Sequence, residues 1–338
     1  MTRPFRVGIS RGYWIADPDA FLARIGLVPV PGVTWEMLPG PPGQIRPGQL
    51  RGCDALLDQV SRIPEDGLDG ADQLAVIARF GVGYDTVDID ACTRRGIAVT
   101  ITPDGIGRSV AVAAITLLLA LTHRLVLQDQ MVRRGEWREK TFQFGTGLTG
   151  RVLGMIGCGN VGRQVCELAA PFRMTRIAYD PHLAPSAAPE GVELVDLPAL
   201  LARADVVCIC AALTAETTHL INAERLALMK PTAFLINVAR GPIVDQRALT
   251  EALAGGRLQG AGLDVFESEP VDPHDPLLRL SNVILSPHTL CMTDECYIGV
   301  GRSACQAILD VAAGRPPRFL VNRAVVDHPR LHARLRPS

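Results

Sequence analysis

The feature that most constrains the fold is a thirty-residue segment, 152–181, in which an apolar stretch leads into three closely spaced glycines. It reads Val-Leu-Gly-Met-Ile and then Gly157-Cys-Gly159-Asn-Val-Gly162, and a second apolar stretch ends at Asp180. This order predicts a strand, a glycine turn, a helix and a second strand, the unit that binds dinucleotides. Gly157 permits the tight turn, Gly159 lets backbone approach a pyrophosphate, and Gly162 lets the helix pack closely.

The carboxylate of Asp180 indicates which dinucleotide is bound. It stands where a ribose diol is expected, and it accepts hydrogen bonds from the diol but repels a 2′-phosphate. Pro181 and His182 follow it, rather than the arginine that an NADP site favours. We therefore expect NAD (NADH) as the cofactor, with its phosphates at the helix N-terminus. A glycine turn in another kind of α/β protein is the plain alternative.

Length and charge limit the other classes of protein. A chain of 338 residues with 48% hydrophobic and 20% charged residues is typical of a two-domain globular enzyme. The net charge of −1, without a block of like charges, gives no basis for binding nucleic acid or an anionic membrane. The N-terminal apolar stretch is too short for a signal peptide, and residues 110–121 are too few to span a bilayer. We expect a cytoplasmic protein in which 110–121 is a buried helix.

The nine cysteines do not predict a metal site or disulfides. Cys208 and Cys210 alternate with apolar residues on one predicted strand, as small core residues do. Cys291 and Cys296 have no second pair at the spacing of zinc ligands. An odd count favours reduced thiols, and we expect no bound metal.

Apolar segments alternate between strand and helix patterns along the chain. Strands are predicted at residues 5–10, 54–58, 75–80 and 97–101, and again at 194–195, 206–210, 233–238, 260–265 and 283–286. Helices are predicted at 88–96, 105–124, 197–202, 223–228, 249–254 and 293–313. The alternation predicts an α/β fold with two doubly wound parallel-sheet lobes.

One of the two predicted lobes is continuous in the chain and the other is formed from two separate segments. We expect residues 105–292 to form a Rossmann-type NAD domain that is inserted into a flavodoxin-like substrate domain made of residues 1–104 and 293–338. A ligand cleft is expected between such lobes, where closure would exclude water.

Four motifs in order resemble those of a known family, and together they cover roughly residues 50–320. They are Phe80-Gly-Val-Gly-Tyr-Asp85, the glycine motif, Asn237-Val-Ala-Arg240-Gly, and Leu263-Asp-Val-Phe-Glu-Ser-Glu269-Pro with Ser286-Pro-His288. The combination is similar to the D-isomer-specific 2-hydroxyacid dehydrogenases, which include phosphoglycerate, glycerate and D-lactate dehydrogenases. The resemblance implies hydride transfer between NAD and a small D-2-hydroxy acid or its 2-keto acid.

Three polar residues at predicted strand ends are the candidate catalytic groups. Arg240 follows a strand, and its guanidinium can grip a carboxylate or keto oxygen with two hydrogen bonds; a surface arginine is the alternative. His288 also follows a strand, and Glu269 in an acidic turn is available to hold the imidazole and favour its charged form. The resemblance implies that Arg240 binds and polarises the substrate and that His288 and Glu269 form the acid–base pair.

The remaining site residues are implied mainly by the resemblance. The glycines after residue 80 expose consecutive N–H groups, and the resemblance implies that the Val82 and Gly83 amides bind the substrate carboxylate; a plain turn is the alternative. Asp264 would contact the nicotinamide amide, or act as a structural cap. The other implied cofactor contacts are Asn160, Val161, Ala211, Val238, Ala239 and His288, besides Gly157, Gly159, Gly162 and Asp180.

Departures from the family pattern bear on the substrate. Thr289 to Met292 are bulkier than the small residues usual after this histidine, which reshapes the predicted pocket. The stretch 57–60 lacks the arginine that pairs with a phosphate, which is evidence against a phosphorylated substrate. Glu269 argues against formate, whose dehydrogenases carry glutamine there. Phosphite oxidation by the same triad and a corepressor-like, NADH-gated binding role stay open.

A homodimer is the last expectation. Relatives bury the region that corresponds to residues 110–121 and 133–144 in a two-fold interface, and this region contains Trp137 and two phenylalanines. The apolar helix could equally be core within one subunit.

Overall fold

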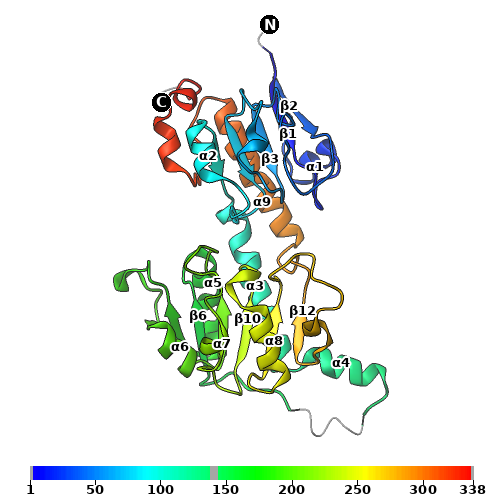
Figure 1. Ribbon diagram of the computed structural model, residues 1–338, viewed down its shortest axis with the longest axis vertical. Helices are drawn as coiled ribbons and strands as arrows, with labels where there is room; N and C mark the ends of the chain where they lie inside the picture. Colours follow the sequence, from blue (N-terminus) through cyan, green and yellow to red (C-terminus); the bar gives the residue numbers. More distant parts are fainter. Residues whose placement is uncertain (1–2, 138–143, 336–338) are drawn as a thin grey trace. The chain divides into compact units, whose positions relative to one another are not determined.

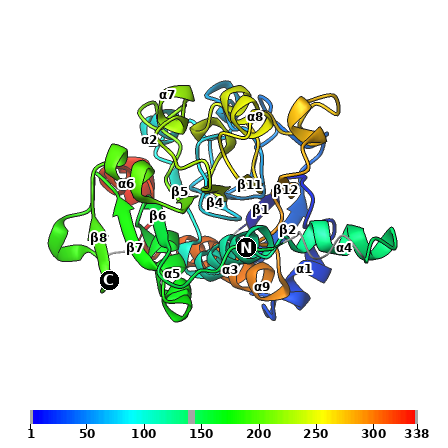
Figure 2. The same cartoon turned by 90° about the horizontal axis from the view of Figure 1, so that it is seen from below.

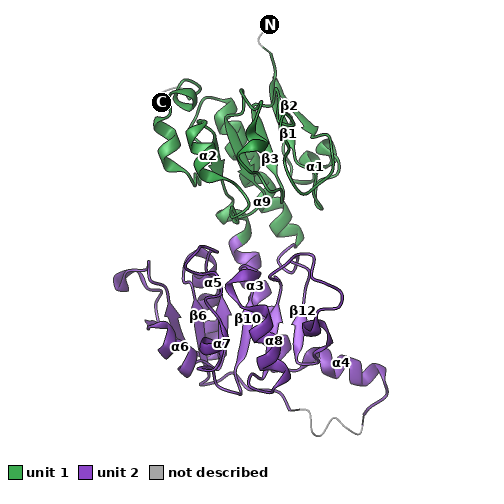
Figure 3. Ribbon diagram, in the orientation of Figure 1, with its two compact units in different colours: residues 1–106, 293–338 green, residues 107–292 purple. Residues whose placement is uncertain are grey.

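The chain forms two compact units. A computed structural model describes residues 3–137 and 144–335 (Figure 1). The first unit consists of Met1–Ile106 with Thr293–Ser338, and the second of Gly107–Met292 (Figure 3). Each unit has its own parallel sheet, and each is described by itself below.

The first unit contains a five-stranded parallel sheet in the order β2-β1-β3-β4-β5. Its strands are β1 (Phe5–Ile9), β2 (Val33–Met37), β3 (Ala55–Asp58), β4 (Val76–Arg79) and β5 (Ala98–Thr100). This is the flavodoxin-like order, in which the chain reverses direction across the sheet between β1 and β3. The expected fold of this lobe is therefore confirmed.

Helices cover both faces of this sheet. They are α1 (Pro18–Arg24), α2 (Ile89–Arg94), α9 (Asp294–Ala312) and the C-terminal α10 (Pro329–His332). Phe21 of α1 meets Tyr297 of α9 edge to face, with ring centroids 5.9 Å apart. On the opposite face, α2 packs into a core that includes Leu56 and Ile77. The α9 helix begins where expected, because the Thr293 side chain accepts a hydrogen bond from the Cys296 amide.

Besides the short C-terminal helix α10, two elements of the first unit, α1 and β2, were not predicted. The helix α1 starts with Asp17, whose side chain accepts from the Ala20 amide, and with Pro18 at the first helical position. Both residues are recognised signals for the start of a helix and can be read from the sequence. The strand β2 is an edge strand whose residues alternate between half-buried and exposed. Its polar composition does not show the strand pattern, because an edge strand pairs with only one neighbour and buries only one face.

The second unit contains a seven-stranded parallel sheet in the order β12-β11-β10-β9-β6-β7-β8. Its strands are β6 (Val152–Ile156), β7 (Thr175–Tyr179), β8 (Val192–Leu194), β9 (Val206–Ile209), β10 (Phe234–Asn237), β11 (Gly260–Leu263) and β12 (Val283–Leu285). Counted from β6, this is the Rossmann order 3-2-1-4-5-6 with one further strand. The order reverses between β6 and β9, which is where such sheets bind ligands.

Two apolar cores lie on opposite faces of this sheet. One is formed with α3 (Pro103–Thr122) and α5 (Asn160–Ala169), and the other with α6 (Leu197–Arg203), α7 (Ala223–Leu226) and α8 (Gln246–Ala254). Figure 2 shows α3 and α5 on one side of the sheet and α7 and α8 on the other. The α3 helix is long and apolar enough to cross a membrane by length and composition, but Leu117, Leu118 and Leu121 lie in the core. The expected buried helix is confirmed.

The end of this helix differs from the prediction. It was expected to continue to Arg124, but it stops at Thr122, and Arg124 takes a left-handed conformation with φ of 53°. A separate helix, α4 (Leu125–Arg133), then begins. The helical spacing of apolar residues continues from α3 into α4, so the sequence does not show that the helix is interrupted. Half of the segment 133–144 that was expected at a dimer interface, residues 138–143, lies outside the described residues.

Candidate active site

The glycine loop after β6 has the geometry that a dinucleotide needs. Gly157 has φ of +85°, and a Cβ there would lie 2.8 Å from the Ala211 Cα. A Cβ on Gly162 would lie 2.3 Å from the Gly157 carbonyl oxygen. A Cβ on Gly159 would meet nothing within 4 Å, so this position faces open space at the first turn of α5. Amides in the first turn of a helix have no acceptor within the helix, so the loop fits a pyrophosphate.

The carboxylate of Asp180 is held against this loop. Its Oδ2 accepts a hydrogen bond from the Cys158 amide at 2.9 Å, and its Oδ1 accepts from the His182 amide at 3.0 Å. The side chain is half-buried, one residue past the end of β7. Because each carboxylate oxygen has a second lone pair, both oxygens can also accept from a ribose diol.

Further predicted residues collect at the carboxyl edge of the sheet. Ala211, Val238, Asp264 and His288 each follow a different parallel strand, β9, β10, β11 and β12. The side chain of Asp264 is buried, and its Oδ1 accepts hydrogen bonds from the Thr289 amide at 3.0 Å and from the next amide at 3.2 Å. Oδ1 of Asp264 therefore caps the loop that follows His288.

His288 and Glu269 are in direct contact. Nδ1 of His288 lies 2.7 Å from Oε2 of Glu269, while Oε1 of Glu269 accepts from the Phe266 amide at 3.0 Å. The side chains are 42% and 37% exposed, so the pair is open to a ligand. His288 has φ of 56°, a left-handed conformation that costs a non-glycine residue about 1–3 kcal/mol.

The local charges keep Glu269 ionised. Burial of the carboxyl is the largest influence and acts to raise its pKa. The hydrogen bond and charge of His288, the Phe266 amide and the charge of Arg240 together outweigh it, so the pKa of Glu269 lies below its ordinary value. An ionised carboxylate only accepts hydrogen bonds, so Nδ1 of His288 carries the proton.

Arg240 is positioned by its backbone. Its carbonyl accepts from the buried Asn237 side chain at 2.9 Å, and its own Nη1 donates to the Ala239 carbonyl at 2.7 Å. The next residue, Gly241, packs so tightly that a Cβ would lie 1.8 Å from the Phe266 carbonyl oxygen. The turn that carries Arg240 therefore rests on the turn that leads to Glu269, and the structure brings the three predicted catalytic residues together in the second unit.

The predicted substrate loop belongs to the first unit and follows β4. Thr102 donates to the Gly81 carbonyl from its amide at 2.9 Å and from its hydroxyl at 3.1 Å. The Arg79 Nε donates to the Gly83 carbonyl at 3.0 Å. Among the residues that the structure describes, the Val82 and Gly83 amides donate to no protein acceptor. They form a half-buried pair of donors suited to an anion.

A second histidine–carboxylate pair was not predicted. Nε2 of His219 lies 2.6 Å from Oε1 of Glu267, and His219 also has a left-handed backbone, with φ of 48°. Nothing in the local sequence pairs these residues, which are 48 positions apart. No group of three or more histidine, cysteine or acidic side chains suited to a metal occurs among residues 3–137 and 144–335.

The second unit, with its Rossmann strand order and glycine loop, is an NAD(P)-binding domain, and comparison with known proteins identifies the family. Residues 115–289 match the D-isomer specific 2-hydroxyacid dehydrogenase NAD binding domain. Glyoxylate reductase from Thermococcus litoralis is 39% identical over 300 residues, 86% of this chain and 90% of that protein. The chain therefore belongs to the D-isomer specific 2-hydroxyacid dehydrogenase family, and it is an oxidoreductase.

Solved structures agree with this assignment. An NADPH-dependent glyoxylate/hydroxypyruvate reductase from Sinorhizobium meliloti, in complex with NADP and malonate, superposes with a TM-score of 0.81 at 28% identity and covers 96% of this chain and 98% of its own. D-Lactate dehydrogenase from Aquifex aeolicus, complexed with NAD and lactic acid, gives 0.79 at 26% identity and covers 91% and 96%. The family resemblance in the sequence is confirmed.

Proposed function

We propose that this protein is an NAD-dependent reductase that converts a small 2-keto acid into the D-2-hydroxy acid. The observation that carries the proposal is the 2.7 Å contact between His288 and Glu269, with Arg240 close enough to lower the pKa of the same carboxyl. An imidazole, a carboxylate and a guanidinium are the groups that reduction of a keto acid requires.

Each of these residues has a distinct role in the proposed reaction. Glu269 holds Nδ1 of His288, which leaves Nε2 to donate a proton to the carbonyl oxygen as it becomes an alkoxide. Arg240 polarises that carbonyl and grips the carboxylate with its fork of N–H groups. When bound in the second unit, NADH would supply the hydride for the keto carbon. In the reverse direction, neutral His288 accepts the hydroxyl proton.

The two units have separate roles in this proposal. The first unit is the substrate domain, where the Val82 and Gly83 amides bind the substrate carboxylate. The second is the cofactor domain, whose contacts follow the loops at the carboxyl edge of its sheet. These contacts are Gly157, Gly159, Asn160, Val161, Gly162, Asp180, Ala211, Val238, Ala239, Asp264 and His288.

The preferred cofactor in this proposal is NAD. Support comes from Asp180, because a carboxylate after the second strand of such a fold accepts from a ribose diol and repels a 2′-phosphate. The two solved relatives contain different cofactors, NADP in one and NAD in the other, so the preference rests on this residue. Glyoxylate is the first substrate to test, because several relatives at about 39% identity are glyoxylate reductases, although a D-3-phosphoglycerate dehydrogenase from Archaeoglobus fulgidus is equally similar. The bulkier residues after His288 are the reason to test larger keto acids beside it.

The test is NADH oxidation by the purified protein with glyoxylate, hydroxypyruvate, pyruvate, phenylpyruvate and phosphohydroxypyruvate. His288→Asn should lower kcat by about 10²-fold or more, which is the size of a general acid–base contribution. His219→Asn is the matched control, because both histidines pair with a glutamate and both have a left-handed backbone that asparagine tolerates. The control should keep wild-type kcat.

Two other outcomes would replace the proposal. NADH formation that depends on phosphite, without turnover of any keto acid, would make phosphite the substrate of the same triad. Tight NADH binding without turnover of either kind would favour a binding role of the corepressor type.

A homodimer in the cytoplasm completes the proposal. Support comes from apolar side chains around α4 that are 56–81% exposed, namely Leu125, Val132, Trp137 and Phe144. None of the nine cysteines, all within the described residues, forms a disulfide, as expected in a reducing compartment. Analytical ultracentrifugation that gave a monomer at micromolar concentration would contradict the dimer.

A further inference from the structure

We infer that a buried ion pair in the first unit, Asp58 with Arg79, positions the Val82 and Gly83 amides for an anionic ligand. These residues do not touch the substrate themselves; they act through the loop that follows β4. The inference rests on the proposed function, because it takes the ligand of those amides to be the substrate carboxylate.

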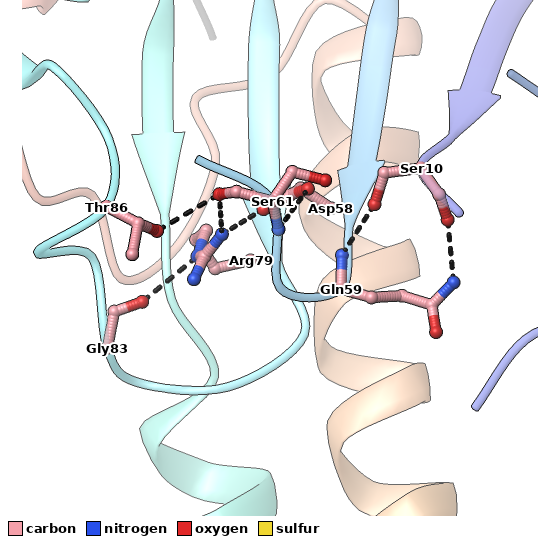
Figure 4. A network of polar contacts seen from close by, with 7 residues as sticks. All are labelled: Ser10, Asp58, Gln59, Ser61, Arg79, Gly83 and Thr86. Carbon is pink, nitrogen blue, oxygen red and sulfur yellow. Dashed lines mark hydrogen bonds and ion pairs between the residues drawn. The ribbon is translucent and has the colours of Figure 1, made fainter. Parts of the chain in front are cut away.

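The pair is built into the sheet. Asp58 and Arg79 are the last residues of the neighbouring strands β3 and β4, and they face each other in the parallel register. Asp58 is fully buried and Arg79 is 7% exposed. Arg79 Nη1 donates to Asp58 Oδ2 and also to the Ser61 carbonyl at 3.3 Å, while the Ser61 amide donates to Asp58 Oδ1 at 3.2 Å (Figure 4).

Another nitrogen of the same guanidinium, Nε, donates a hydrogen bond to the loop that follows β4. Arg79 Nε donates to the Gly83 carbonyl at 3.0 Å, and Figure 4 shows this contact on the side away from Asp58. At the other end of the loop, Thr102 holds the Gly81 carbonyl with two hydrogen bonds. The Val82 and Gly83 amides thus lie between two anchored carbonyls.

Because these two carbonyls are held in place, the geometry of the peptide bonds also orients the Val82 and Gly83 N–H groups. Because a trans peptide is planar, fixing the Gly81 carbonyl fixes the direction of the Val82 N–H on the other side of that peptide. Fixing the Gly83 carbonyl restricts the rotation that would swing the Gly83 N–H away. Gly81, at φ of +148°, is in a conformation that glycine alone adopts readily, so the loop does not hold itself through local preference.

An ion pair is not the simplest way to fill this space. Replacing a buried ion pair by apolar residues of similar volume is often neutral or stabilising, whereas removal of one partner leaves a buried charge. A leucine and a methionine would fill the same volume but would offer no donor to the Gly83 carbonyl. The planar fork of arginine reaches the carboxylate and the loop at the same time. A double variant with apolar residues at positions 58 and 79 should therefore keep the stability of the fold but lose the positioning of the loop.

The experiment compares Asp58→Leu/Arg79→Met with the wild type. Apolar replacement keeps the fold, and loss of the loop anchor should raise the KM of the preferred keto acid about tenfold or more, as loss of one or two charge-assisted hydrogen bonds implies. The kcat should change by less than about threefold, and the Kd of NADH should not change, because neither property depends on these amides. Hydrogen exchange of residues 80–86, followed by mass spectrometry, should become about tenfold faster.

The control is Asp54→Asn, at the residue just before β3. Asp54 is also buried and paired, with Arg3 at 2.7 Å and Arg334 at 3.0 Å, but it does not contact the loop. This variant should lower the Tm while the KM and the exchange of residues 80–86 stay at wild-type values. Faster exchange of 80–86 in both variants would reduce Asp58 and Arg79 to a general stabilising role and overturn the inference.

The outcomes separate this inference from the proposed function. A stable double variant with wild-type KM and wild-type exchange overturns the positioning role. If the wild type turns over no keto acid, the proposed function fails, and the exchange of residues 80–86 in the double variant alone decides whether the pair orders the loop.

Discussion

Nδ1 of His288 lies 2.7 Å from Oε2 of Glu269, and Oε1 of the same carboxylate accepts a hydrogen bond from the Phe266 amide. Both oxygens of the carboxylate are therefore held by hydrogen bonds, and the carboxylate in turn orients the imidazole. This contact links residues 19 positions apart that follow two different strands, and its chemistry can be tested residue by residue.

Glu269→Gln should weaken reduction. The pKa of Glu269 lies below its ordinary value, so above about pH 5 the wild-type side chain is an ionised carboxylate that holds Nδ1–H of His288 with a charge-assisted hydrogen bond. The uncharged glutamine holds the imidazole less firmly, so kcat/KM should fall by about 10-fold to 10²-fold. Initial rates of keto-acid reduction with NADH measure this. Glu267→Gln is the control, and a wild-type kcat/KM for Glu269→Gln would remove Glu269 from the acid–base pair.

Arg240→Lys should lose most of the activity although the charge is kept. A lysine ammonium cannot make the two parallel hydrogen bonds that a guanidinium makes to a carboxylate. We expect kcat/KM to fall by about 10²-fold, with contributions from both KM and kcat, because polarisation acts in the transition state. Arg247→Lys on the exposed side of α8 is the control. Equal rates for the two variants would mean that Arg240 does not contact the substrate.

Asp180→Ser should relax the choice of cofactor. Removal of the carboxylate removes the charge that repels a 2′-phosphate, while serine still offers a hydroxyl to the ribose. The ratio of kcat/KM for NADPH to that for NADH should rise about tenfold or more, the effect of removing one close repulsive charge. The measurement uses one saturating keto acid with both cofactors. An unchanged ratio would place the discrimination elsewhere in the loop.

Two glycine variants should separate stability from cofactor binding. In Gly162→Ala the new Cβ meets the Gly157 carbonyl at 2.3 Å, so the free energy of unfolding should fall by about 1–3 kcal/mol. In Gly159→Ala the Cβ points into open space, so stability should hold while NADH affinity falls, because the methyl group occupies the path of the pyrophosphate. Urea unfolding and NADH fluorescence titration test both. Normal NADH affinity in Gly159→Ala would move the phosphates away from this turn.

Asp205→Asn should destabilise the protein in a pH-dependent way. Burial acts to raise the pKa of Asp205, but the Val152 amide, Lys230 and Arg151 together hold the pKa below its usual value. A lowered pKa contributes stability that is present above the unfolded-state value near 3.8 and is lost as the pH falls through the folded-state value. We expect a loss of about 1–3 kcal/mol at pH 7 that shrinks below about pH 4, measured by urea unfolding. A pH-independent difference would exclude the ionic contribution.

The local chemistry and the chain order of the elements could be predicted from the sequence. Three glycines at fixed spacing, an acid at the end of the next strand and alternating apolar segments depend on short-range rules, because turns, caps and periodic burial involve residues close in the chain. The family motifs added the roles of Arg240, Glu269 and His288. The same rules failed where a pattern was weak, at the polar edge strand β2, or continuous, at the break between α3 and α4.

The contacts between residues far apart in the chain could be seen only in the folded protein. The register of β3 against β4 sets Asp58 opposite Arg79, and the packing of two turns brings Glu267 to His219. The close packing that Gly162 permits proved to be against the Gly157 carbonyl rather than mainly against the sheet. These contacts follow from strand register and from the fit of loops at one sheet edge. Both are set by the global packing of the core, which short-range patterns in the sequence do not specify.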